Sequence, residues 1–269
     1  MMKLISSFED VRDSINRIRG LHRGFHTNFF LEQRKIQIWC AHHKLSVLES
    51  ENTAIFMKKD DGFTSIMYCT SNLDELFIAL SQLPQDDIYV VDQIVDARTD
   101  TSLLDRFVEV GYKIRTSLVR MSMINKEQHR EDDLLIDFHA TENDIPELTV
   151  LLHANFDKYS EQLPTLEELK DFIEAKHVII QRIGGNIAGF IIYDQSPSTL
   201  YLRYWLVNSE YRNQGVGSLL FREFSIRGNK CKRHMLWVME DNDNAIIRYK
   251  HYGYREENMK NYVLTFNLN

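Results

Sequence analysis

The sequence predicts an α/β (α+β) protein built from two similar domains. Three observations support this prediction: helix and strand patterns alternate along the whole chain, the same order of elements occurs twice, and one strongly polar segment separates the two copies. The chain has 269 residues, of which 43% are hydrophobic and 11% aromatic, a composition typical of globular domains with their own cores.

The composition also argues against several classes of protein. A net charge of −7 disfavours a general nucleic-acid binder, and the acidic excess lies in residues 131–269, at −6, which favours a cationic acceptor such as an amine. We expect no membrane span and no secretory signal, and therefore a cytoplasmic protein. The three cysteines, Cys40, Cys69 and Cys231, lack metal-ligand spacing, so we expect reduced thiols and no metal.

The most polar segment is "NKEQHREDDLL", residues 125–135. It lacks helical or strand periodicity, so it predicts a linker. We place the first domain at residues 1–125, the linker at 126–133 and the second domain at 134–269.

The first domain begins with two helices, expected over 7–20 and 26–42. Apolar, β-branched and aromatic runs then predict strands. The expected strands and the two helices between them occupy residues 45–50, 53–59, 63–69, 72–83 (helix), 87–95, 101–111 (helix) and 116–123.

The second domain repeats this order. A strand over 134–140 precedes a helix over 141–156, with Thr141 as its cap, and a second helix over 165–176, where Thr165 and Glu168 fit a capping box. The further elements are expected at 177–183, 186–195, 199–207, 215–224 (helix), 233–240, 242–253 (helix) and 262–269. The last helix stops at Gly253, which tolerates a left-handed C-terminal cap.

The segment "SEYRNQGVGS", residues 209–218, lies between a predicted strand and a predicted helix. The first N–H groups of a helix have no intrahelical partner and favour an anion, and glycines let a phosphate approach the backbone. Arg212 adds charge. A P-loop would need a lysine after Gly217, and a dinucleotide fingerprint would need a glycine where Leu220 stands.

The stretch "YLRYWLVNSEYRNQGVGSLLFREF" resembles the strand, loop and helix of the GNAT acyltransferase superfamily, whose pyrophosphate loop reads Q/R-x-x-G-x-G/A. "NDNAIIRYKHYGY", residues 242–254, resembles a second motif of that family. Residues 134–269 carry the resemblance, while the first half resembles the family only in element order. The resemblance implies two GNAT-like domains, each with a mixed, mostly antiparallel sheet flanked by helices.

By this resemblance the second domain would bind acetyl-CoA, or another acyl-CoA, and transfer the acyl group directly to a primary amine. The acceptor would be a small molecule or a peptide. The resemblance implies the following cofactor-binding positions: Leu206, Val207, Arg212, Asn213, Gln214, Gly215, Val216, Gly217, Ser218 and Asn242. A strand N–H near Leu206 would stabilise the oxyanion, and Asn242 could instead only cap its helix.

Tyr249 would be the catalytic acid that protonates the leaving thiolate, because a tyrosine stays protonated at neutral pH. Tyr201, Arg203 and Tyr159 would line the acceptor site. Many family members place a glutamate on the strand before the loop, and this strand has none. The base therefore stays open between water, Asp157, Glu161 and Glu240.

The first domain lacks this chemistry. Its turn at Thr70–Asn72 has neither the arginine nor the glycines, and Phe107 stands where Tyr249 stands later. We expect a degenerate domain that shapes the acceptor pocket or forms an interface; a homodimer is left open. The alternative function is a non-catalytic acyl-CoA-binding or regulatory protein, and a third is a nucleotide-binding protein.

Overall fold

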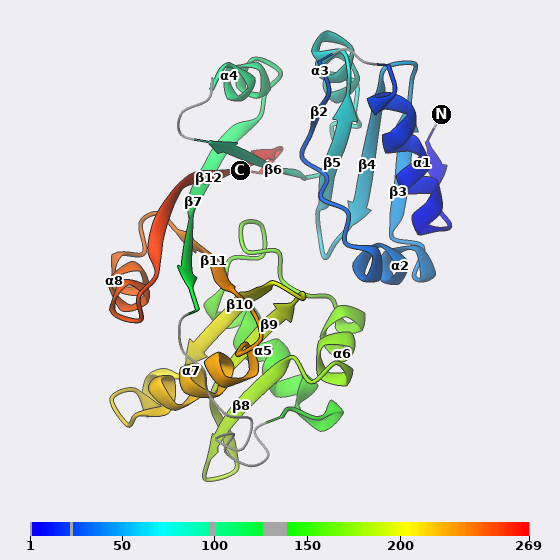
Figure 1. Ribbon diagram of the computed structural model, residues 1–269. Coiled ribbons are helices and arrows are strands. Elements are labelled where there is room, and N and C mark those ends of the chain that lie inside the picture. Colours follow the sequence, from blue (N-terminus) through cyan, green and yellow to red (C-terminus); the bar gives the residue numbers. More distant parts are fainter. Residues whose placement is uncertain (1, 22–23, 97–100, 126–138, 269) are drawn as a thin grey trace. The chain divides into compact units, whose positions relative to one another are not determined.

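The protein is described by a computed structural model (Figure 1) that covers residues 2–21, 24–96, 101–125 and 139–268. The chain forms two compact units: the first unit is Met1–Leu118 with Met259–Asn269, and the second unit is Val119–Asn258. The C-terminal residues, which the sequence assigned to the second domain, thus belong to the first unit. The predicted linker, 126–133, lies outside the described residues.

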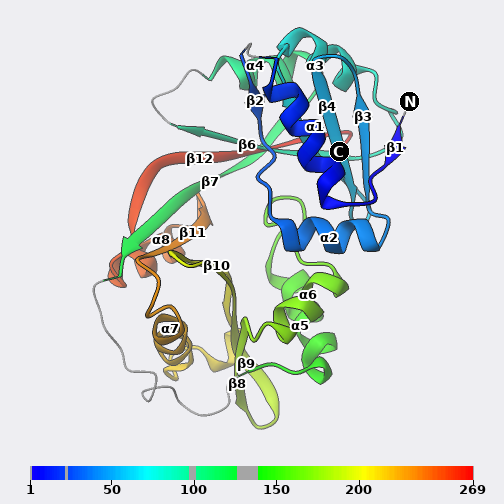
Figure 2. The ribbon, with the colours of Figure 1, turned by 45° about the vertical axis from the view of Figure 1, so that its right-hand side comes forward.

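In the first unit, a sheet with strand order β1-β3-β4-β5-β6-β12 lies between two pairs of helices. Helices α1 and α2 pack on one face, with α1 across β3 and β4 (Figure 2), and α3 and α4 pack on the other. The elements are β1 (Lys3–Leu4), α1 (Phe8–Arg19), β2 (His26–Thr27), α2 (Gln33–Ala41), β3 (Leu45–Glu49), β4 (Thr53–Lys59), β5 (Thr64–Thr70), α3 (Leu73–Ser81), β6 (Tyr89–Asp96) and α4 (Ser102–Glu109).

The second unit has the same layers, with strand order β7-β11-β10-β9-β8. Helices α5 and α6 cover one face of this sheet, and α7 and α8 cover the other. Its elements are α5 (Ile145–Asn155), α6 (Leu166–Glu174), β8 (Val178–Ile183), β9 (Asn186–Gln195), β10 (Thr199–Val207), α7 (Val216–Arg227), β11 (Arg233–Met239) and α8 (Asp243–His251).

Two long strands, β7 (Lys113–Ile124) and β12 (Arg255–Phe266), each contribute residues to both units. In the first unit, β12 pairs antiparallel with β6 from Met259 to Phe266. Both strands are longer than predicted, because their polar ends broke the apolar pattern from which strands are read.

In the part of the chain that the structure describes, β5 pairs in parallel with β6 and β10 with β11, among antiparallel pairs such as β4 with β5 and β9 with β10. The predicted fold class, mixed and mostly antiparallel sheets flanked by helices, is therefore confirmed. Gly253 has the predicted left-handed conformation, with φ at 92°. The capping box is present too: Glu168 N–H donates to Thr165 Oγ1 (3.3 Å), and Thr165 N–H donates to Glu168 Oε2 (2.8 Å).

Two expected elements differ from the structure. The helix expected over 26–42 is confined to α2, because residues 26 and 27 form β2, which pairs with β5 at Cys69 and Thr70. The strand expected at 134–140 lies largely outside the described residues; of its last residues, His139 forms a single bridge with Ile179. Thr141 caps a 3-10 turn at Glu142–Asp144 rather than α5 itself.

Candidate active site

A β-bulge in β10 separates two neighbouring strands of the second unit. Strand β10 pairs in parallel with β11 from Thr199 to Leu202, and this pairing ends there although both strands continue. The register of β10 with β9 shifts between Leu202 and Tyr204, so Arg203 is the extra residue. No strand pairs with the β11-facing edge of β10 beyond this point within the described residues.

The bulge also changes which side chains face which layer. Leu200 and Leu202 pack in the hydrophobic cluster between the sheet and α7, whereas Tyr204 and Leu206 pack in the hydrophobic cluster between the sheet and helices α5 and α6. Trp205 is consequently turned to the α7 side, where its ring stacks on Phe221 at 5.3 Å between centroids.

The predicted phosphate loop leads directly into α7. Asn213 and Gly215 have positive φ, at 63° and 79°, so the chain turns sharply before the helix. Gly215 is the N-cap and has no side chain that could accept from the first helical N–H groups. Among the described residues, the backbone N–H groups from Asn213 to Ser218 donate no hydrogen bond, and residues 212–215 are exposed.

The equivalent helix of the first unit is capped differently. The N-cap of α3 is Asn72, whose side chain accepts hydrogen bonds from Asp74 N–H (3.0 Å) and Glu75 N–H (3.2 Å). The α3 terminus therefore satisfies its own donors, while the α7 terminus leaves them available for an anion.

Two glycines let α7 approach the sheet. A Cβ on Gly189 of β9 would lie 2.7 Å from the Leu206 carbonyl oxygen and 3.0 Å from side-chain carbons of Val216 and Leu220. A Cβ on Gly217 would meet Val207 at 3.3 Å. The first turn of α7 therefore sits directly over β9 and the end of β10, next to the separated strands.

Tyr249, the predicted acid, projects from α8 onto the same part of β10. Its ring lies 5.9 Å from that of Trp205 and 5.8 Å from that of Tyr254, and it is half-buried. Burial raises the pKa of Tyr249 above that of a free phenol; Arg248 opposes the shift and Glu161 adds to it. The hydroxyl is thus kept protonated, as a proton donor must be.

Leu206 and Val207, which were both predicted to bind the cofactor, direct their backbone polar groups to opposite edges of β10. Asn208 N–H donates to Ala188 O at 3.0 Å, toward β9. Polar groups alternate along an antiparallel strand, so Leu206 also turns its N–H and C=O toward β9. Trp205 and Val207 direct theirs to the open edge. Leu206 therefore has no backbone group at the open edge, whereas Trp205 and Val207 do; cofactor binding at Leu206 and Val207 stays a prediction.

The predicted acceptor residues are partly brought together. Arg203 donates through Nε to Asp194 Oδ2 (2.6 Å), and its guanidinium lies 4.3 Å above the Tyr201 ring. Tyr159 lies in the loop between α5 and α6, with the Lys158 ammonium 5.2 Å from its ring. Asn242 caps α8, since its Oδ1 accepts from Ala245 N–H at 3.1 Å.

In the first unit, a side chain of the protein itself occupies the corresponding gap, which lies between β5 and β6. Strands β5 and β6 pair in parallel only from Thr64 to Ile66. Beyond that point Asn28 bridges them: its Nδ2 donates to Ile66 O (3.2 Å) and Asp92 O (3.0 Å), and its Oδ1 accepts from Tyr68 N–H (2.6 Å). A ligand cannot pair with backbone groups that Asn28 already uses.

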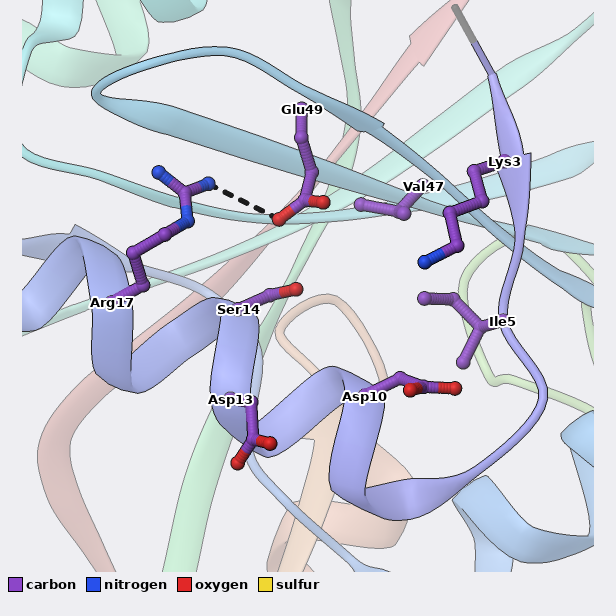
Figure 3. Close-up of a pocket in the computed structure, with 8 residues that line it drawn as sticks. All are labelled: Lys3, Ile5, Asp10, Asp13, Ser14, Arg17, Val47 and Glu49. Atoms are coloured by element: carbon purple, nitrogen blue, oxygen red, sulfur yellow. Dashed lines mark hydrogen bonds and ion pairs between the residues drawn. The ribbon is translucent and has the colours of Figure 1, made fainter.

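A hollow of about 270 Å³ lies elsewhere in the first unit, between β1, α1 and β3 (Figure 3). Several of its charged residues already have partners: Arg17 donates to Glu49 (3.1 Å) and to the carbonyl of Glu51, and Asp10 accepts from Ser6 and Ser7 at the start of α1. We assign no ligand to this hollow.

The sequence also predicted reduced cysteines, no metal site and no membrane-spanning segment. The three cysteines are free thiols and buried. Within the described ranges, no group of three His, Cys, Asp or Glu residues is arranged to hold a metal ion. In that same part of the chain, no helix combines the length and the apolar character that crossing a membrane requires.

Comparison with known proteins identifies the class to which this site belongs. Residues 145–254 match the model of the acetyltransferase (GNAT) family, and they contain the loop, the bulged strand and Tyr249. The matched residues make up most of the second unit. No curated protein matches the chain.

Solved structures extend the similarity in fold to the whole chain. A tandem GNAT protein from the clavulanic acid biosynthesis pathway has a TM-score of 0.63 at 10% identity, covering 98% of this chain and 97% of that one. A GCN5-related N-acetyltransferase from Sphaerobacter thermophilus has a TM-score of 0.59 at 10% identity, covering 98% and 94%. One from Kribbella flavida has 0.55 at 12% identity, covering 87% and 93%. The fold of the whole chain is thus shared with these proteins.

Sequence reasoning missed three features of this arrangement. Gly189 stands inside an apolar strand, where a lone glycine indicates a close approach, so a signal was present. The bulge at Arg203 and the bridge made by Asn28 left no such signal, because both depend on pairing between distant segments.

Proposed function

We propose that the second unit transfers an acyl group, acetyl in the simplest case, from acyl-CoA to a primary amine by direct attack in a ternary complex. The observation that carries the proposal is the open N-terminus of α7, whose unpaired N–H groups and positive-φ turn adjoin the unpaired edge of β10. A diphosphate with an extended, amide-containing arm matches both features.

In this proposal the pyrophosphate of the co-substrate binds the N–H groups of residues 213–218, with Arg212 adding charge. The pantetheine arm pairs with the backbone of Trp205 and Val207, as an added strand would. The same edge supplies the N–H that stabilises the oxyanion when the amine attacks the thioester carbonyl. Tyr249 then donates its proton to the leaving thiolate.

The acceptor is proposed to enter beside Tyr201 and Arg203, at the bulge. Asp194 neutralises Arg203, so the arginine orients neighbouring groups without repelling a cationic amine.

Tyr249→Phe tests this function against the alternative of a non-catalytic acyl-CoA-binding protein. For an enzyme, removal of the hydroxyl lowers amine-dependent thiol release by about 10²-fold or more and leaves acetyl-CoA affinity nearly unchanged. Tyr112→Phe is the matched control, since it removes a buried tyrosine hydroxyl from the first unit. Acetyl-CoA binding without thiol release from wild type, across a panel of amines, would support the alternative.

A nucleotide-binding protein is the third candidate. It predicts that ATP or NAD competes with CoA in a thermal-shift assay, whereas the proposed function predicts stabilisation by CoA alone.

A further inference from the structure

The loop between α5 and α6, residues 156–164, is held in one conformation by its own hydrogen bonds. Glu161 N–H donates to Asp157 O (2.9 Å), and Asp157 N–H donates to Glu161 Oε2 (2.8 Å). Ser160 Oγ donates to Asp157 Oδ2 at 2.5 Å. One carboxylate oxygen of Glu161 is therefore fixed, and the other, Oε1, accepts no hydrogen bond from the described residues.

Strand β10 holds this loop at the bulge. The Tyr204 hydroxyl lies within hydrogen-bond distance of two loop carbonyls, Glu161 O (2.9 Å) and Gln162 O (2.5 Å). Tyr204 is the first residue after Arg203 and is buried, with 5% of its surface exposed. Glu161 is thereby anchored to β10 where that strand leaves β11.

The Glu161 carboxylate also lies within electrostatic reach of the predicted acid. Its charge contributes to the raised pKa of Tyr249 on α8 and to that of Tyr204. Tyr204, which holds the loop, and Trp205, whose ring lies 5.9 Å from that of Tyr249, are consecutive residues of β10, so the loop and α8 both contact this part of the strand.

Other carboxylates considered for this region are less suited to take up a proton. Asp157 accepts from Ser160, as described above. Glu168 is buried in the capping box of α6. Glu240 is exposed at the end of β11.

We propose that Glu161 is the general base of the acyl transfer, an inference that rests on the proposed function. Its carboxylate takes one proton from the substrate ammonium, and the neutral nitrogen attacks the thioester carbonyl carbon. The C–N bond forms, the C–S bond breaks, and the thiolate leaves with the Tyr249 proton. The nitrogen loses its second proton, which restores Tyr249, and Glu161 releases its proton to water.

The environment suits a base. Burial raises the pKa of Glu161 above that of an ordinary glutamate; the Asp157 N–H opposes this and the Asp157 carboxylate reinforces it. A higher pKa makes a carboxylate a better proton acceptor near neutral pH.

Glu161→Gln tests the inference with two acceptors, an alkylamine that is protonated at the assay pH and an aryl or hydrazine-type amine that is already neutral. Glutamine can still accept a hydrogen bond from Asp157 N–H, so the loop should keep its conformation. Acetyl-CoA affinity and melting temperature that match those of wild type would verify that it does. Glu174→Gln, on the exposed face of α6, is the control. Glu161→Asp, which keeps the carboxylate, retains part of the activity.

We expect Glu161→Gln to lower kcat by about 10²–10⁴-fold with the alkylamine and by less than about tenfold with the neutral amine. The acidic limb of the kcat/KM profile with the alkylamine moves up to the pKa of the amine itself, so activity returns at high pH as the alkylamine loses its proton. An equal loss with both amines, or no loss, overturns the inference and leaves the proposed function standing. No turnover by wild type with either amine overturns both.

Discussion

Gly189→Ala tests how closely α7 must sit on the sheet for the phosphate site to form. The added Cβ would lie 2.7 Å from Leu206 O and 3.0 Å from both Val216 Cγ1 and Leu220 Cδ1, against 3.4 Å for an ordinary contact. The two side chains can rotate, but the carbonyl belongs to β10, so the helix or the strand must move by several tenths of an ångström. Overpacking of this kind costs about 1–3 kcal/mol.

This cost should lower the melting temperature by roughly 3–9 °C. Because Val216 begins α7, the displacement also moves the N–H groups proposed to bind pyrophosphate, and acetyl-CoA affinity should fall. Thermal unfolding with and without acetyl-CoA measures both effects. Gly20→Ala, at the end of α1 with φ at −66°, is the control: its Cβ would lie 3.3 Å from Asn16 O, so it should change the melting temperature much less and leave acetyl-CoA affinity unchanged. Unchanged stability and affinity in Gly189→Ala would refute the close-packing argument.

Two further predictions concern stability. Asn28→Ala leaves Ile66 O, Asp92 O and Tyr68 N–H without their side-chain partner. We expect it to destabilise the first unit by about 1–3 kcal/mol, measured by denaturant unfolding, and to create no second acetyl-CoA site. The control Asn16→Ala, at an exposed position on α1, should have no effect. Burial would raise the pKa of Glu257, but hydrogen bonds from Ser122, Arg233 and Arg120 outweigh it and hold that pKa below the ordinary value. The stability from Glu257 is therefore present above about pH 4.3 and lost as pH falls through the lower folded pKa, so Glu257→Gln should lower the melting temperature at pH 7 and much less at pH 3. An equal loss at both pH values would contradict this.

The sequence predicted those features that depend on local pattern. Apolar periodicity located the helices and strands, and the loop at 212–217 stood out through its glycines and arginine. The capping box of α6 and the left-handed Gly253 follow from residue type alone, because each needs only neighbours within one turn.

Features that arise from pairing between distant segments were not predictable in the same way. Residues 26–28 read as part of a helix, yet β2 and Asn28 pair with β5 and β6, so tertiary contacts override local propensity. Leu206 and Val207 looked equivalent in sequence, and only the register with β9 shows that they face opposite edges. The part played by Glu161 likewise depends on the fold of its loop.

The proposed reaction of the second unit is transfer of an acyl group from a thioester to an amine. The most direct test incubates wild-type protein with acetyl-CoA and a panel of amines, and measures free thiol together with the mass of each amine product. We expect thiol release that depends on the amine, with one acetylated product for each thiol released. Thiol release at the same rate without amine, or none across the panel despite acetyl-CoA binding, would contradict it.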